Sequence, residues 1–406
     1  MNLTEGDITQ LVRKIAIPAS IGFFCSTMLN VIDTVFAGLI STQALAALSI
    51  SFPVFFIIIA FNTGLSTGSS ALISNALGEG NRHKVAHLSA QVISYSLMLY
   101  IILAPITLLL TPHLFTILGA EGEYHRLAVT YMNVILMGSI FFLLMYASNS
   151  ILMAHGNTRC IRNFLASSMF INAALDPWFL YGGFGLPAMG LQGIAFATVV
   201  TMIVGAVYMG FEVIRDGYFK ECTLRDFIPN PKTFLAIAKQ SFPASLNMMT
   251  IGIGIIIITF FIKDFGTSAV AAYGITMRIE QISLLPTIGL TIAALSIIGQ
   301  NNGAKKYARI METIKITLKY GILVISIGAV AMFCFPTQLV AFFTSDQDVI
   351  QVGSQYLRIA AITSWSYVII SVCIASLQGM KRPFFPLLIG LFRQIVLPPL
   401  TFYSLI

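Results

Sequence analysis

The sequence predicts an all-α polytopic membrane protein made of two pseudosymmetric lobes of six helices each. Hydrophobic residues make up 57% of the 406 residues and charged residues only 10%, which excludes an ordinary soluble domain. Apolar runs long enough to cross a bilayer recur along the whole chain. Features of the first half also return in the second half at a nearly constant offset.

Eleven apolar runs are long enough to span a membrane as helices. They cover residues 14–40, 46–74, 86–110, 127–154, 160–182, 190–214, 236–262, 268–298, 310–340, 353–378 and 383–406. Alternate connections are basic, as at Arg82, Lys84 and Lys305, whereas the opposite connections carry acids such as Glu121 and Asp264. The positive-inside bias therefore predicts a multi-pass protein of a bacterial or archaeal inner membrane with a cytoplasmic N-terminus.

The two halves of the chain are expected to be repeats. The segment IAIPAS, with Pro18, matches KQSFPAS, with Pro243, at an offset of 243 − 18 = 225. Asn75 in SNALGEG matches Gln300 in GQNNGA at the same offset. Both halves begin on the basic side, so the repeats share their orientation and should be related by an axis along the membrane normal.

The repeat predicts the domain boundaries. We expect a first lobe over residues 1–216, a polar cytoplasmic linker over 217–235 and a second lobe over 236–406. In this alignment the second half has no counterpart of the sixth span. We therefore expect a twelve-helix fold whose last helix is missing from this sequence.

Two acids in the first lobe are expected to lie at one depth in the membrane. Asp33 and Asp176 lie near the same ends of their spans, Asn30 and Asn172 share their helix faces, and Thr198 reaches a similar level. Two carboxyl groups held away from water favour sharing a proton or binding a cation, which indicates ion coupling through H⁺ or Na⁺. The alternative is that each acid only hydrogen-bonds a neighbouring helix and holds the lobe together.

The second lobe carries a different set of candidates. Glu280, with Asn247, Met248, Met277 and Gln281, is expected to form a polarizable, acid-bearing wall of a cavity for amphipathic cations. The alternative is that Glu280 bonds a helix or loop and that the methionines fill the core.

These pieces resemble the multidrug and toxic compound extrusion transporters, within them the prokaryotic branch that includes the DNA-damage-inducible F proteins. The matching segments are IPAS, NVIDTVFAG, NAALDPWFLYG, GQNNGA and LQGMKRP, in order along the whole chain. The resemblance implies twelve helices in two lobes and the export of organic cations in exchange for protons or sodium, without enzymatic activity.

The resemblance also assigns roles to residues. The family's first-lobe ion site corresponds to Asp33, Asn172, Asp176 and Thr198, where sodium is the alternative to a proton. Pro18 and Tyr131 are implicated in bending of the first helix, which Asn30 is expected to support. Another branch uses acids on its seventh and tenth helices, and both of those helices lack an acid here.

The sequence therefore predicts a monomeric antiporter, surrounded by lipid, that needs no cofactor and binds no nucleic acid. A lipid-carrier flippase of the same superfamily is the nearest alternative, but it calls for a basic central cavity, and only Arg278 and Arg393 lie inside the predicted spans. An intramembrane aspartyl protease also needs paired acids, but its GxGD motif is absent.

Overall fold

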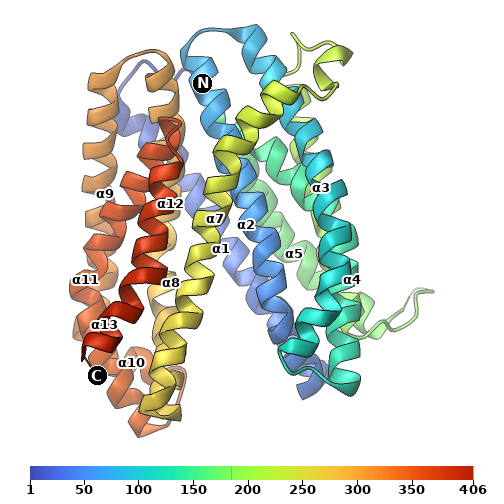
Figure 1. Ribbon diagram of the computed structural model, residues 1–406, viewed down its shortest axis with the longest axis vertical. Coiled ribbons are helices and arrows are strands. Elements are labelled where there is room, and N and C mark those ends of the chain that lie inside the picture. Colours follow the sequence, from blue (N-terminus) through green and yellow to red (C-terminus); the bar gives the residue numbers. More distant parts are fainter. Residues whose placement is uncertain (184, 406) are drawn as a thin grey trace.

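The computed structural model describes residues 1–183 and 185–405. Its long helices lie roughly along one axis in two groups, and each group follows one half of the sequence (Figure 1). This arrangement confirms the predicted helical membrane fold. Ten helices among the described residues are long and apolar enough to cross a membrane.

The first lobe contains six helices. They are α1 (Ile8–Ile40), α2 (Thr42–Gly78), α3 (Arg82–Ile117), α4 (Gly122–Ala154), α5 (Arg159–Tyr181) and α6 (Leu191–Arg215). The sequence analysis counted α5 as an ordinary span, but α5 is not among the ten apolar helices. Its polar residues, which include Asn172 and Asp176, lower its hydropathy.

The second lobe follows a linker with the short helix η1 (Leu224–Phe227). Its elements are α7 (Pro231–Ile262), η2 (Lys263–Phe265), α8 (Thr267–Gly303), α9 (Tyr307–Cys334), α10 (Pro336–Ala341), α11 (Gln347–Gly379), α12 (Phe384–Leu391), the π-helical turn η3 (Phe392–Val396) and α13 (Leu397–Leu405). The last three elements follow one another directly and form the eleventh crossing.

Two predicted boundaries in this lobe were wrong. Helix α7 begins at Pro231, five residues before the predicted 236, because Asn230 caps the helix and a proline fits its first turn. The predicted span 310–340 is two helices, since the chain leaves helical geometry at Phe335 and restarts at Pro336.

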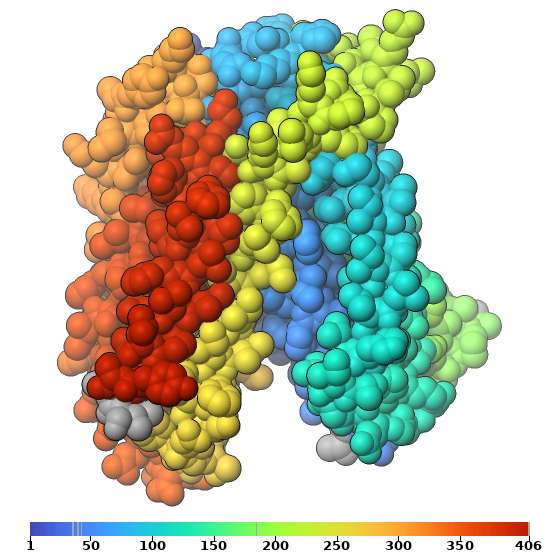
Figure 2. Space-filling model, viewed as in Figure 1, coloured from blue at the N-terminus to red at the C-terminus, as the bar shows by residue number. Residues whose placement is uncertain are grey.

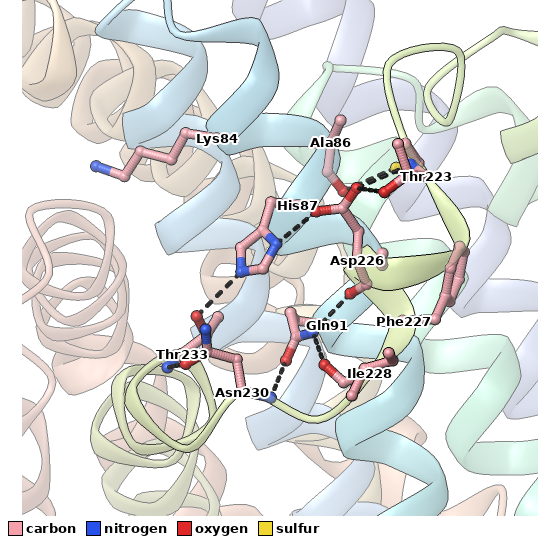
Figure 3. A network of polar contacts seen from close by, with 12 residues as sticks. Lys84, Ala86, His87, Gln91, Thr223, Asp226, Phe227, Ile228, Asn230 and Thr233 are labelled. Atoms are coloured by element: carbon pink, nitrogen blue, oxygen red, sulfur yellow. Dashed lines mark hydrogen bonds and ion pairs between the residues drawn. The ribbon is translucent and has the colours of Figure 1, made fainter.

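The linker is docked onto α3 through a polar network (Figure 3). His87 Nδ1 lies 2.8 Å from Asp226 Oδ1, and Gln91 Nε2 donates to the carbonyl oxygens of Asp226 and Ile228. The Asn230 backbone N–H donates to Gln91 Oε1 at 2.9 Å. The linker thus ties the start of α7 to the first lobe.

The two lobes meet through the pairs α1–α8 and α2–α7, which the repeat relates to each other. We call the end of the molecule that carries the N-terminus and the connections after α2, α4, α6, α8 and α11 the basic end. There, Asn75 Nδ2 donates to the Gly379 carbonyl and Gln300 Nε2 donates to the Ala154 carbonyl, both at 2.8 Å. The donors and the acceptors are each 225 residues apart, so these bonds form a symmetric pair.

Glycines let the helices approach at this contact. A Cβ on Gly78 would overlap the Gln300 carbonyl oxygen, and a Cβ on Gly303 would overlap the Asn75 carbonyl oxygen. We call these two bonds and two glycines the inter-lobe lock. At the opposite end the lobes separate, and Figure 2 shows an open gap between them. The molecule is therefore closed at the basic end and open at the other.

Candidate functional site

The acids of the first lobe meet where α1 and α5 run side by side. Close approach of these helices depends on Gly22, since a Cβ there would lie 3.0 Å from the Arg162 Cα atom. The Thr158 hydroxyl at the start of α5 also donates to the Ile15 carbonyl at 2.8 Å. Both helices start at the basic end, so similar distances along them bring Asp33 and Asp176 to one depth.

The cluster consists of Asp33, Asn172 and Asp176. Asp33 is 8% exposed and the other two side chains are fully buried. With its amide oriented to satisfy the surrounding bonds, Asn172 Nδ2 lies 2.7 Å from Asp33 Oδ1 and 2.7 Å from Asp176 Oδ2. The two carboxyl groups also hydrogen-bond to each other. A contact between two carboxyl groups needs a proton on one of them, because an ionised carboxylate only accepts.

The same oxygens suit a cation. Carboxylate and amide oxygens are ligands for hard cations, and Asn172 would present its oxygen to an ion if its amide turned over. A loaded site would then hold either a shared proton or one cation among these three side chains. The cluster can therefore exchange ions.

The other first-lobe candidates surround this cluster to different degrees. Tyr131 on α4 is buried and within electrostatic reach of both acids. Thr198 on α6 is buried too, but its hydroxyl donates to the Ile194 carbonyl of its own helix. Asn30 was wrongly placed in the cluster: it is exposed, and its amide donates to the Ser26 carbonyl one turn back.

Pro18 lies buried within α1, about two turns of helix inside the bilayer from the basic end. It removes one backbone donor from the helix. Beside it, the Ser20 hydroxyl donates to the Pro286 carbonyl of α8, and Gly289 of α8 packs against the Ala16 carbonyl. The weakened turn of α1 therefore lies at the contact between the two lobes.

The second lobe encloses a cavity of about 750 Å³ between α7, α8, α11 and the eleventh crossing. Asn247, Met277, Glu280 and Gln281 line it, as the sequence predicted. Met248 is not among its lining residues, because Asn247 and Ile251, four residues apart, present one face of α7 and Met248 is turned by about 100° from it.

Sequence reasoning missed two sets of residues. The amides of the inter-lobe lock were recognised as repeated positions but not as partners across the lobes. Tyr356, Tyr367, Arg393 and Gln394 also line the second-lobe cavity. A charged residue inside a span, as Arg393 is, was the available signal for the second set.

Comparisons with known proteins agree with this architecture. A family model described as MatE matches residues 18–178 and again residues 243–403, with starts 225 residues apart. The chain is 26% identical over 385 residues to a probable multidrug resistance protein NorM of Thermotoga maritima, covering 94% of this chain and 82% of that one. It is 26% identical over 361 residues to a probable multidrug resistance protein YoeA of Bacillus subtilis, covering 87% and 77%.

A solved structure is similar along nearly the whole chain. It is a transporter of the MOP superfamily from Pyrococcus furiosus, with a TM-score of 0.88 and 26% identity over 97% of this chain and 88% of that chain. The repeated lobes and these matches define a helical membrane transporter, not an enzyme. The chain belongs to the MatE family, to which the matches assign multidrug efflux transport.

Proposed function

We propose that this protein is a secondary-active antiporter that exports amphipathic, mostly cationic compounds in exchange for protons or sodium ions. The observation that carries the proposal is the buried contact among Asp33, Asn172 and Asp176. Charged groups inside a membrane are costly, and this cluster gives two acids a reason to be there. The multidrug resistance relatives support the substrate class.

The proposed cycle couples the cluster to the shape of α1. A proton or cation entering between the carboxyl groups changes the bonds that hold α1 to α5. Pro18 then provides the place where α1 bends, because its turn lacks one backbone hydrogen bond. The bend lies against α8, so it alters the contact between the lobes.

The proposal includes an orientation in an inner membrane. The basic end faces the cytoplasm by the positive-inside bias, and the open end faces outward. The protein acts as a monomer, since each chain carries both lobes.

Transport in a defined membrane tests this function. Purified protein is placed in liposomes loaded with a fluorescent organic cation, and a pH gradient or a sodium gradient is imposed separately. We expect one of the two gradients to drive dye movement against its concentration. Equal dye movement with both gradients collapsed would contradict antiport.

A further inference from the structure

The cavity of the second lobe holds two opposite charges that do not pair with each other. Glu280 enters it from α8 and Arg393 from the π-helical turn η3. Within the part of the chain that the structure describes, no ion pair joins their side chains, although both line one cavity. Uncompensated charges in a low-dielectric cavity are costly, which calls for another partner.

A tyrosine of α11 attends each charge. Glu280 hydrogen-bonds to Tyr356, and Arg393 hydrogen-bonds to Tyr367 with its guanidinium carbon 4.8 Å from the ring centroid. A carboxylate can accept about four hydrogen bonds and a guanidinium offers five N–H donors. One tyrosine each therefore leaves most of this bonding capacity for a ligand.

The backbone of η3 favours this arrangement. Consecutive residues of an α-helix point about 100° apart, yet both Arg393 and Gln394 line the cavity. The π-helical turn widens the helix there, and such turns are frequent at functional sites. Gly254 of α7 makes room, since a Cβ there would lie 2.6 Å from Gln394 Oε1.

The remaining wall is mainly apolar. It includes Ile251, Ile255, Ile258, Leu284 and Ile370. Such a wall suits the hydrophobic frame of a ligand, while the two charged groups fix its ends. An Arg fork matches a carboxylate with two parallel hydrogen bonds, and a carboxylate such as Glu280 matches a cation.

We propose that this cavity selects amphipathic zwitterions, with the substrate's cationic group at Glu280 and its carboxylate at Arg393. This deepens the proposed function, on which it rests for the export step. Binding alone does not depend on ion coupling.

The test uses two probes of one skeleton, a rhodamine zwitterion with a free carboxylate and its methyl ester, which is only a cation. Equilibrium binding to the full purified protein in detergent is followed by fluorescence anisotropy without any gradient. We expect the zwitterion to bind at least about tenfold more tightly than the ester, as one charge-assisted bond pair supports. In Arg393→Gln this preference should disappear while ester binding is kept.

Further variants separate the charges from the fold. Arg393→Lys should keep part of the preference, because it keeps the charge and loses the fork. Glu280→Gln should weaken both probes. Arg278→Gln is the matched control, since Arg278 is exposed on the same helix outside the cavity lining and should change neither affinity.

Two results would overturn the proposal. One is equal affinity of the wild-type protein for both probes, and the other is an equal loss of both probes in Arg393→Gln and Arg393→Lys. Selective binding without gradient-driven movement of either probe would instead contradict antiport and leave the zwitterion site standing. The two failures are therefore distinguishable.

Discussion

The two lobes share one architecture but differ in where they place their polar groups. The first lobe buries Asp33, Asn172 and Asp176 in direct contact. At the repeat offsets of 225 and 222, their counterparts in the second lobe are Ile258, Gln394 and Pro398. All three counterparts line the cavity of about 750 Å³. One position in the repeat therefore became an acidic cluster in one lobe and a cavity wall in the other.

The contact between the lobes did not diverge in this way. The Asn75 and Gln300 amides still make equivalent bonds, and the small residues Gly78 and Gly303 still pack against equivalent carbonyls. A symmetric contact needs the same surface on both sides, whereas a site inside one lobe has no such requirement. The repeat thus conserves closure and frees each interior for its own chemistry.

The largest expected effect breaks the acidic cluster. Asp33→Asn keeps the volume of the side chain and removes its titratable group, so gradient-driven export should fall by roughly 100-fold as the coupling energy is lost. Transport in liposomes measures this, and Asp176→Asn should behave in the same way. Asp264→Asn, an exposed acid at the open end of the second lobe, is the control. Normal export by Asp33→Asn would end the coupling role.

The symmetric part of the comparison is tested at the inter-lobe lock. Gly78→Ala and Gly303→Ala should each cost about 1–3 kcal/mol in the closed basic end through overpacking, and the two costs should be similar. Spin-label distances across the basic end would show a larger open fraction. Gly210→Ala is the control because no atom lies within 4 Å of its Cβ position. Unchanged distances in both lock variants would contradict the closure role.

The first helix sharpens the difference between the lobes. Pro18→Ala restores a backbone donor and should stiffen α1, lowering export by about tenfold while the acids stay in place. Pro243→Ala changes the equivalent position of α7, whose repeat counterpart of Asp33 is apolar, and should cost less. Equal transport rates for these two variants would argue against a special role of α1. Initial dye efflux rates provide the comparison.

The smallest expected effect concerns the linker that joins the lobes. The Thr223 backbone N–H, then His87 and the Thr223 hydroxyl, hold the pKa of Asp226 at about 2, below its ordinary value of 3.8. Its contribution to linker docking is therefore complete above about pH 4 and is lost as the pH falls toward 2.

Pepsin cleavage of the detergent-solubilised protein checks this prediction, since the protease works over that pH range. Cleavage between residues 217 and 228 should increase as the pH falls from 4 to 2. Asp226→Asn should be cleaved at a rate that follows only the activity of the enzyme. A wild-type rate that follows the Asp226→Asn rate at each pH would exclude a role of this carboxylate.

The sequence by itself determined the membrane fold, the repeat and the identity of the buried acids. Apolar length and the offset of 225 are local or periodic signals, and they predicted helices that the structure contains. Asp33 and Asp176 were recognisable because an acid within an apolar run is costly without a purpose. Helix ends were less certain, as the start of α7 at Pro231 shows.

Only the tertiary structure decided which of these residues meet. Asn172 contacts both acids because Gly22 lets α1 and α5 approach, whereas Asn30, on the same helix as Asp33, turns away. Arg393 enters the second-lobe cavity through a π-helical turn that no local pattern predicted. Contacts between distant helices depend on packing at single small residues and on the rotation of each helix, and neither is written in the hydropathy of one segment.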